Sequence, residues 1–355
     1  MVKRENLKIR GRGADWNPSN RFEKLRYEPD DDLEESEQLA PGTQFLKDHS
    51  KSLITYNDSP DVGFDASINP YRGCEHGCIY CYARPTHEYL GYSAGLDFET
   101  KILVKDEAPD LLRNELSSNR WKPQVVALSG VTDSYQPIER KLELTRRCLA
   151  VFREFRNPVA VVTKNYLVTR DLDHLTDLAK DQAAAVFLSV TTLDGDLCRI
   201  LEPRTSHPLR RLAAIEKLHS AGVPTGVMVA PVIPGLTDHE LPAVLAACAM
   251  AGAQFAGYIT LRLPLTVAPL FEQWLDQHLP DRKNKVLNRI RALRDGKLND
   301  PRFGLRMRGQ GIFADQVAEL FAISCRKAGI AERGPRLSTA MFRRPSNTQL
   351  ELFNS

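Results

Sequence analysis

Short apolar runs alternate with longer segments of helical periodicity through the middle of the chain. The apolar runs, which we interpret as strands, lie near 64–70, 125–129, 159–163, 185–191, 226–232 and 255–261. Continuously apolar strands separated by helices are typical of a parallel sheet covered on both faces. The pattern therefore predicts an α/β fold. Strands joined by right-handed crossovers suit an incomplete (βα) barrel as well as an open sheet.

The segments between these strands carry apolar stripes that fit helices. One stripe begins near Pro137 and continues to Phe152. A later stripe ends at Gly222, which suits a helix C-terminus because glycine readily adopts left-handed backbone angles. Beyond Pro264 the alternation stops, and 267–330 is predicted to be wholly helical.

These patterns divide the chain into consecutive parts. Residues 1–53 lack apolar periodicity and change from basic to acidic, which predicts an N-terminal arm that is partly disordered or packed on the domain. Residues 54–265 form the predicted core, and 266–332 form a helical C-terminal region. Residues 333–355 are rich in Pro and Arg and are predicted to be a flexible tail.

The composition is that of an ordinary globular protein, with 42% hydrophobic and 26% charged residues among 355. A formal net charge of +3 is too small to indicate a nucleic-acid partner by itself, so any basic surface has to be local. The weakly polar run 241–259 is interrupted by Gly252, Gln254 and Gly257, which argues against a membrane span. Because the N-terminus carries no apolar leader, we expect a soluble cytoplasmic protein.

The cysteines add candidate chemistry to this picture. The chain has seven, an odd number that argues against a disulfide framework. Three of them lie within one short loop: Cys74, Cys78 and Cys81. Gly73 and Gly77 relieve crowding there, and three thiolates can hold an iron–sulfur cluster while leaving one iron open to a substrate. A zinc site completed by His76 or His87 is the alternative.

The order C-x3-C-x-aromatic-C, with Tyr80 as the aromatic residue, resembles the signature of the radical S-adenosylmethionine (SAM) superfamily. Its position directly after a first predicted strand also fits, and the resemblance covers about 60–265. The stretches 81–87, 132–137 and 201–204 are similar to the branch related to spore photoproduct lyase.

This resemblance implies a partial (βα)6 TIM-like barrel of the radical SAM type, in which the three loop cysteines bind a [4Fe–4S] cluster. It also implies that SAM binds the open iron and is cleaved to a 5′-deoxyadenosyl radical, with a reducing flavodoxin or ferredoxin as the electron source. The class of reaction stays open, and the branch favours DNA repair. However, the lyase carries a hydrogen-donating cysteine beside its SAM-binding serine, where this chain has Leu128 before Ser129. Repair by the same hydrogen relay is therefore not expected.

Ligands of parallel α/β barrels lie at the carboxyl ends of the strands. The residues that we expect there to contact SAM are Ser129, Thr132, Asp133, Lys164, Ser189, Glu202 and Arg204. In the superfamily, polar groups after the second strand receive the SAM amino group. Lys164 would pair with the SAM carboxylate, Ser189 with a ribose hydroxyl, and 229–234 with Tyr258 would enclose the adenine. The alternatives are a solvated strand-end role for Lys164 and a turn or helix cap for Asp133.

The remaining cysteines, at 148, 198, 248 and 325, show no ligand spacing, so we predict no second cluster. Cys148 and Cys248 fall on apolar helix faces and are expected in the core. Cys198 lies just beyond the fourth predicted strand, on the catalytic face, and is a candidate hydrogen donor.

Several functions fit these observations. They are a radical SAM enzyme acting on nucleic acid, a radical SAM enzyme modifying a small molecule or protein, and a zinc-stabilised binding module without catalysis. The first is favoured by basic residues of the helical region that would contact phosphates: Arg282, Lys283, Lys285, Arg289 and Arg291. The alternative for these residues is an ordinary solvated helix face.

The C-terminal sequence 349–353, Gln-Leu-Glu-Leu-Phe, resembles the peptide by which bacterial replication and repair proteins dock on the DNA sliding clamp. In such peptides a glutamine hydrogen-bonds while large apolar residues fill adjacent pockets. Here these would be Gln349 and the apolar Leu350, Leu352 and Phe353. The alternative is that these apolar residues fold back onto the protein's own surface.

Overall fold

The computed structural model describes residues 9–23 and 42–345. Its larger sheet has the strand order β10-β9-β8-β7-β6-β3-β2. The bounds of these strands are Ile54–Tyr56 (β2), Ala66–Ile68 (β3), Val126–Leu128 (β6), Val159–Thr163 (β7), Ala184–Ser189 (β8), Thr225–Val232 (β9) and Phe255–Thr260 (β10).

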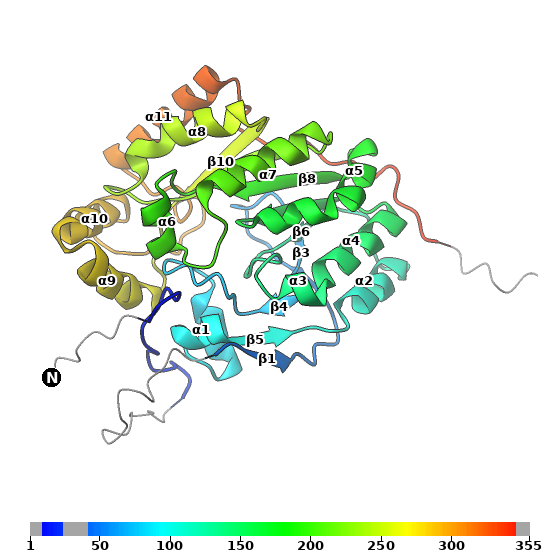
Figure 1. Cartoon of the computed structure of the whole chain (residues 1–355), viewed down its shortest axis with the longest axis horizontal. Coiled ribbons are helices and arrows are strands. Elements are labelled where there is room, and N and C mark those ends of the chain that lie inside the picture. Colours follow the sequence, from blue (N-terminus) through cyan, green and yellow to red (C-terminus); the bar gives the residue numbers. More distant parts are fainter. Residues whose placement is uncertain (1–8, 24–41, 346–355) are drawn as a thin grey trace, which may run out of the picture.

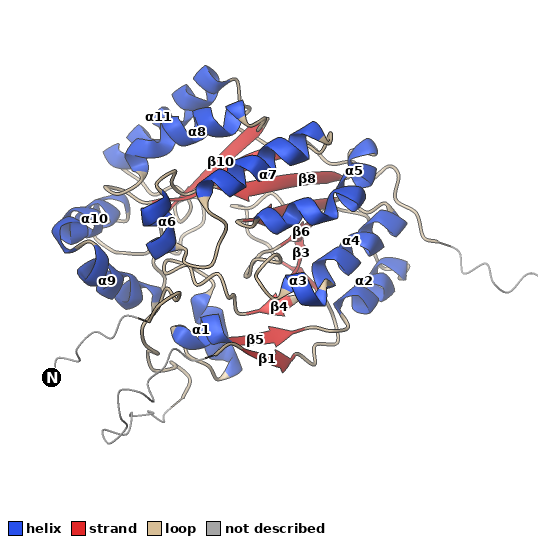
Figure 2. Cartoon of the chain, viewed as in Figure 1, coloured by secondary structure: helices blue, strands red, loops and turns tan. Residues whose placement is uncertain are grey.

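From β3 to β10 the strands of this sheet are parallel, and neighbours in the sheet are neighbours along the chain. Because each crossover then advances in the same direction, the connecting helices all fall on one face (Figures 1 and 2). This is the arrangement of a barrel and not of a doubly wound open sheet, so the predicted partial (βα) barrel is confirmed. Strand β2 joins the edge of the sheet antiparallel to β3.

Helices cover the outer face of this sheet (Figure 1). They are Ala108–Ser117 (α2), Leu144–Phe155 (α4), Leu172–Lys180 (α5), Pro208–Ser220 (α7), Leu241–Met250 (α8) and Ile312–Ala328 (α11). The short helix Glu139–Leu142 (α3) instead packs through Leu142 in a separate cluster with Tyr71, Ile102 and Val104. As expected, α7 ends just before Gly222, which has a left-handed φ of 78°. The expected helix beginning near Pro137 is instead two helices, because Glu143 between α3 and α4 has a φ of 51°.

Side chains alternate along each strand between a sealed outer face and a more open inner face. In β7, Val159 and Val161 are fully buried under the helices, whereas Ala160 and Val162 are only partly buried. The same alternation places partly buried residues on the inner face of the next strands: Phe187, Met228, Ala230, Gly257 and Ile259. The expectation that the sheet is covered on both faces is therefore wrong for the inner face, because a partial barrel leaves that side facing its own interior.

A second, smaller sheet lies below the barrel and has the strand order β1-β5-β4 (Figure 1). Its strands are Gln44–Lys47 (β1), Tyr71–Arg72 (β4) and Lys101–Val104 (β5). Next to it are the 3₁₀ helix η2, Arg84–Leu90, and the helix α1, Leu96–Thr100. The described parts of the N-terminal arm, residues 9–23 and β1, pack on the domain. The shorter remaining elements are Tyr166–Asp171 (η3), Gly195–Leu201 (α6) and Asp238–Glu240 (η4).

The C-terminal region is only partly helical. Its helices are Val267–His278 (α9), Pro280–Leu293 (α10) and α11, with turns and bends from 294 to 311. The prediction of continuous helix over 267–330 is wrong in that stretch because it contains Pro301 and glycines with left-handed backbone angles, among them Gly296 and Gly304. In the described residues, no helix is both long and apolar enough to cross a membrane.

Residues 333–345 run past the amino-terminal ends of the barrel strands and are held there by hydrogen bonds. Arg343 donates its backbone N–H to Phe155 O, and Arg344 donates through its guanidinium to Ser118 O and Trp121 O. Phe342 also packs against the Phe155 ring. This part of the predicted flexible tail is therefore anchored, whereas residues 346–355, which hold the clamp-like sequence, lie outside the described residues.

Candidate active site

The cysteine loop follows β4 and is shaped by two glycines with left-handed backbone angles. Gly73 has a φ of 79° and Gly77 a φ of 66°. A Cβ on Gly77 would lie 2.6 Å from the Glu99 carboxylate, and one on Gly73 would lie 3.0 Å from the His87 ring. These close approaches let the loop fold tightly, so its cysteines reach the carboxyl ends of the barrel strands.

The three loop cysteines form no disulfide, and burial raises the pKa of Cys78 and Cys81. A metal ligand must be a thiolate, so these thiols need a nearby positive charge to ionise. Within the described ranges, no group of three or more His, Cys, Asp or Glu side chains is arranged around a single metal ion. Such a group is what the zinc alternative requires. A [4Fe–4S] cluster instead takes each thiolate on a different iron, so its ligands need not converge on one point.

Asp133 contacts the cysteine loop through His76. Asp133 Oδ2 lies 3.3 Å from His76 Nδ1 and accepts the Lys164 backbone N–H at 2.8 Å. Its Oδ1 accepts the Thr163 hydroxyl at 2.7 Å and the Tyr135 N–H at 2.9 Å. Burial alone would lower the pKa of His76, but Asp133 and the Cys74 thiol outweigh it and raise the pKa to about 10. Asp133 therefore adopts the turn role that the sequence left open, and its oxygens are already occupied by the protein.

Thr132 and Lys164 are the expected SAM contacts that remain available. The Thr132 hydroxyl is buried and has no hydrogen-bond partner among the described residues. Lys164 directs its ammonium group into the barrel, where Nζ donates to Ala230 O at 3.1 Å and lies 3.7 Å from Glu202 Oε1. A buried hydroxyl without a partner and an inward-facing cation each fit a ligand that carries an amino and a carboxylate group, as SAM does. By contrast, the Ser129 hydroxyl already bonds Ser134.

Glu202 is the centre of a buried hydrogen-bond network. Its carboxylate accepts from the Arg211 guanidinium, the Tyr80 hydroxyl and the Thr191 hydroxyl. Burial opposes ionisation, but Arg211 and Lys164 lower the pKa of Glu202 to about 2. Because Tyr80 stands between two of the loop cysteines, Glu202 acts on the loop through Tyr80.

The other expected site residues do not join the group around Lys164. Cys198 is buried behind Glu202, 3.2 Å from Arg211 Nη2, and burial raises its pKa to about 11. Ser189 is buried at the end of β8, where it lies on the inner face of the sheet beside Met228. Arg204 pairs with Glu75 at 3.4 Å and lines a surface pocket with Arg140.

The expected adenine contacts are wrong for Tyr258 and Val229. Both are buried on the outer face of the sheet, where the Tyr258 ring packs against Phe321 of α11. A strand alternates its side chains, so their neighbours Met228 and Ala230 face inward instead. These inward residues border the space that a nucleoside would occupy.

Sequence reasoning missed the residues that fasten the N-terminal arm to the loop. Arg84 and Glu99 form a fully buried ion pair at 2.5 Å, and Glu99 also accepts the backbone N–H groups of Gly13 and Ala14. A Cβ on Gly13 would lie 1.8 Å from Gly77 O, so the arm rests directly on the loop. Glu99 lies far from Gly13 in sequence, and neither residue belongs to a local pattern that could have indicated this contact.

Comparison with known proteins agrees with this geometry. Residues 68–248 match the radical SAM superfamily. An uncharacterized protein of Mycobacterium tuberculosis is 37% identical over 232 residues, which cover 65% of this chain and 67% of that protein. Another from Methanocaldococcus jannaschii is 29% identical over 197 residues, covering 56% of this chain and 71% of the relative. The fold is similar to that of spore photoproduct lyase complexed with dinucleoside spore photoproduct, with a TM-score of 0.59, 16% identity and 81% of each chain covered.

The family match spans just over half of the chain and includes the cysteine loop, Thr132, Lys164 and Glu202. Family membership implies a [4Fe–4S] cluster and SAM as cofactors, and the donor set described above fits both. This chain therefore belongs to the radical SAM superfamily.

Proposed function

We propose that this protein is an enzyme that cleaves SAM reductively and uses the resulting radical on a nucleic acid. The observation that carries the first half is the placement of the Lys164 ammonium near Cys78 of the cysteine loop, at the carboxyl ends of the strands. When bound, the cluster and SAM together supply a 5′-deoxyadenosyl radical. The protein's part is to bind and orient SAM and to keep water from the reacting atoms.

Each of these tasks has residues that suit it. Lys164 offers a positive charge to the SAM carboxylate, and the Thr132 hydroxyl offers a hydrogen bond to its polar end. Glu202 stays ionised and holds the Tyr80 hydroxyl, which keeps the loop in one position. The arm around Gly13 and Ala14 covers the outer side of the loop and limits access of water.

The fold likeness to a lyase solved with a dinucleoside photoproduct supports a nucleic-acid substrate. The reaction need not be the same, because Leu128 stands where that lyase carries its hydrogen-donating cysteine, and Leu128 is fully buried in the outer core. Any hydrogen donor in this chain would therefore have to come from another position.

Three of the expected phosphate-binding residues of α10 give less support than the sequence led us to expect, whereas Arg282 and Lys285 form no ion pair among the described residues. Lys283 pairs with Asp276 at 2.6 Å, Arg289 with Asp238 at 3.1 Å, and Arg291 with Glu272 at 3.9 Å. Pairing with carboxylates reduces what these side chains can offer to phosphates.

The substrate proposal is tested with anaerobic, dithionite-reduced protein, SAM and oligonucleotides built from deuterated nucleosides. We expect single-stranded or duplex DNA to increase 5′-deoxyadenosine formation and to transfer deuterium into it, as measured by mass spectrometry. If nucleic acids have no effect and a small-molecule or protein fraction stimulates the reaction, the alternative substrate class is correct.

A further inference from the structure

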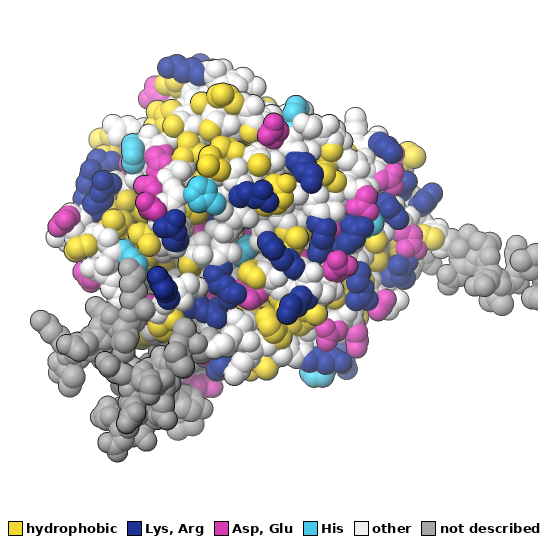
Figure 3. Space-filling model, viewed as in Figure 1, with side chains coloured by type: hydrophobic (Ala, Val, Ile, Leu, Met, Phe, Trp, Pro, Cys, Tyr) yellow, Lys and Arg dark blue, Asp and Glu magenta, His cyan; other side chains and the backbone are white. Residues whose placement is uncertain are grey.

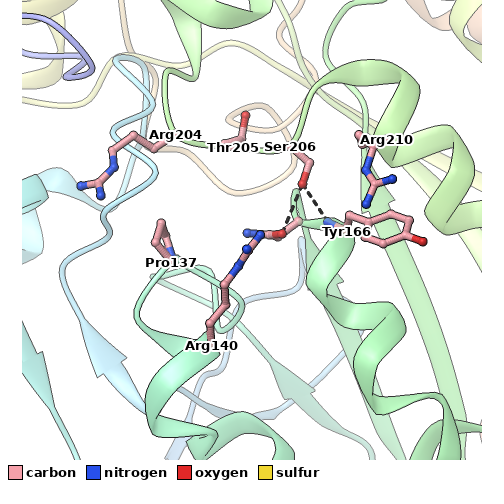
Figure 4. Close-up of a pocket in the computed structure, with 8 residues that line it drawn as sticks. Pro137, Arg140, Tyr166, Arg204, Thr205, Ser206 and Arg210 are labelled. Atoms are coloured by element: carbon pink, nitrogen blue, oxygen red, sulfur yellow. Dashed lines mark hydrogen bonds between the residues drawn. The ribbon is translucent and has the colours of Figure 1, made fainter.

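A surface pocket of about 300 Å³ opens beside the cysteine loop, on the rim formed by the carboxyl ends of the strands (Figure 4). Its residues come from the loops after β6, β7 and β8, so it draws on consecutive βα units. Arginines line it from different elements: Arg140 of α3, Arg204 of the α6–α7 loop and Arg210 of α7. The pocket lining contains no Asp or Glu.

In the described part of the chain, no carboxylate forms an ion pair with Arg140 or Arg210, unlike Lys283, Arg289 and Arg291 of α10. Arg210 lies over the Tyr166 ring at 3.7 Å, a contact that fixes its guanidinium without removing its charge. Figure 4 shows Arg140 rising from α3 and Arg210 reaching from α7 toward the same opening. Figure 3 shows Lys and Arg side chains across the middle of this face, between α7 and α3.

The floor of the pocket is fixed by hydrogen bonds. Ser206 donates its hydroxyl to Asn165 Oδ1 at 3.2 Å and accepts the Tyr166 N–H at 2.8 Å. Asn165 is buried and donates to Tyr135 O at 2.7 Å. A rigid floor keeps the surrounding arginines in place before a ligand arrives, which lowers the cost of binding.

The same floor touches the cysteine loop. Asn165 Nδ2 lies 3.3 Å from His76 Nε2, and the Arg204 N–H donates to His76 O at 3.3 Å. A ligand in the pocket is therefore separated from the loop by a single layer of side chains. This position suits a second point of attachment for a substrate whose reacting part lies in the barrel.

We infer that this pocket binds a phosphate group through Arg140 and Arg210, and that the group belongs to the phosphodiester backbone of the substrate. Guanidinium groups from separate elements suit an anion with several oxygens, because each can take its own oxygen pair. The choice of a phosphodiester rests on the proposed nucleic-acid function, whereas the phosphate site itself rests on the pocket alone.

The test uses anaerobic, cluster-containing full-length protein. The binding of a fluorescein-labelled single-stranded DNA dodecamer is measured by anisotropy, and the binding of inorganic phosphate by calorimetry. The pocket variant carries Arg140→Gln and Arg210→Gln. A control variant carries Arg120→Gln and Arg326→Gln, which are exposed arginines outside the pocket and give the same change of charge. Iron content and the thermal unfolding midpoint verify that both variants fold.

We expect DNA affinity to fall about tenfold in the pocket variant and to change less than about twofold in the control, with phosphate competing for the wild-type site. If the wild type binds no DNA but the pocket variant loses phosphate binding, the site stands with a small phosphorylated ligand, and the nucleic-acid function fails. Equal DNA binding by wild type and pocket variant overturns the pocket while leaving that function intact. The phosphate site is also overturned if the pocket variant binds phosphate and DNA as the wild type does and is impaired only in accepting electrons from an acidic electron carrier.

Discussion

The carboxylate of Glu202 lies against the guanidinium of Arg211, and both side chains are almost completely buried. Glu202 also accepts from the Tyr80 hydroxyl, so one buried anion connects a helix of the barrel to the cysteine loop. Burial by itself would raise the pKa of Glu202, but Arg211 and Lys164 lower it to about 2, which keeps the carboxylate ionised.

Replacing this carboxylate with an amide of the same size tests the network. We expect Glu202→Gln to lower the free energy of unfolding by about 3–5 kcal/mol, because Arg211 is left buried without a counter-charge. Urea unfolding followed by circular dichroism measures the loss. The control is Asp196→Asn, which removes an exposed ion pair with Arg199 and should cost less than about 1 kcal/mol. Similar small losses in both variants would show that Glu202 does not stabilise the fold.

The contact between the N-terminal arm and the cysteine loop predicts a role in protecting the cluster. Gly13→Ala places a Cβ where Gly77 O already lies, so the arm must move away from the loop. We expect the visible absorbance of the cluster to bleach severalfold faster in air. Gly42→Ala is the matched control, because no described residue lies within 4 Å of a Cβ built there. If both variants bleach at the wild-type rate, the arm does not shield the loop.

Lys164 should affect SAM binding more than cluster content. Lys164→Met removes the positive charge that faces the barrel interior and keeps a side chain of similar length. We expect SAM affinity to fall about tenfold with iron content unchanged, because the ammonium is a charge partner and not a cluster ligand. Equilibrium dialysis with labelled SAM measures this, with Lys180→Met, an exposed lysine of α5, as the control. Unchanged SAM affinity would return Lys164 to a structural role.

The cysteine loop was predictable from sequence because its ligands are consecutive and its glycines mark the turns. The parallel strands of the larger sheet were also predictable, since their apolar runs are continuous, whereas β1, β2, β4 and β5 were not predicted. The side of the sheet to which each strand residue points could not be predicted. Met228 and Val229 are consecutive apolar residues that point to opposite faces, and a continuous apolar run does not show which one points inward. The pairing of Glu99 with Arg84 and Gly13 also escaped prediction, because it depends on how distant segments meet.

The clamp-like sequence 349–353 stays a prediction. Arg343 and Arg344 are hydrogen-bonded to the end of α4 and to the segment between α2 and β6, a few residues before this sequence begins. A peptide covering 343–355 should bind a purified bacterial sliding clamp, measured by calorimetry. The same peptide with Gln349, Leu352 and Phe353 replaced by Ala should bind at least about tenfold more weakly, because these are its predicted anchors. Equal binding by both peptides, or none by either, would remove the clamp as a partner.

The formation of 5′-deoxyadenosine by the anaerobically reconstituted protein tests the central claim most directly. With dithionite and SAM, the wild type should contain iron and sulfide and should release 5′-deoxyadenosine. The variants Cys74→Ala, Cys78→Ala and Cys81→Ala should lose both the cluster and the product, whereas Cys148→Ala, which alters a buried core thiol, should keep them. A wild type that binds iron but forms no 5′-deoxyadenosine, or a full cluster in any of the three loop variants, would contradict this account.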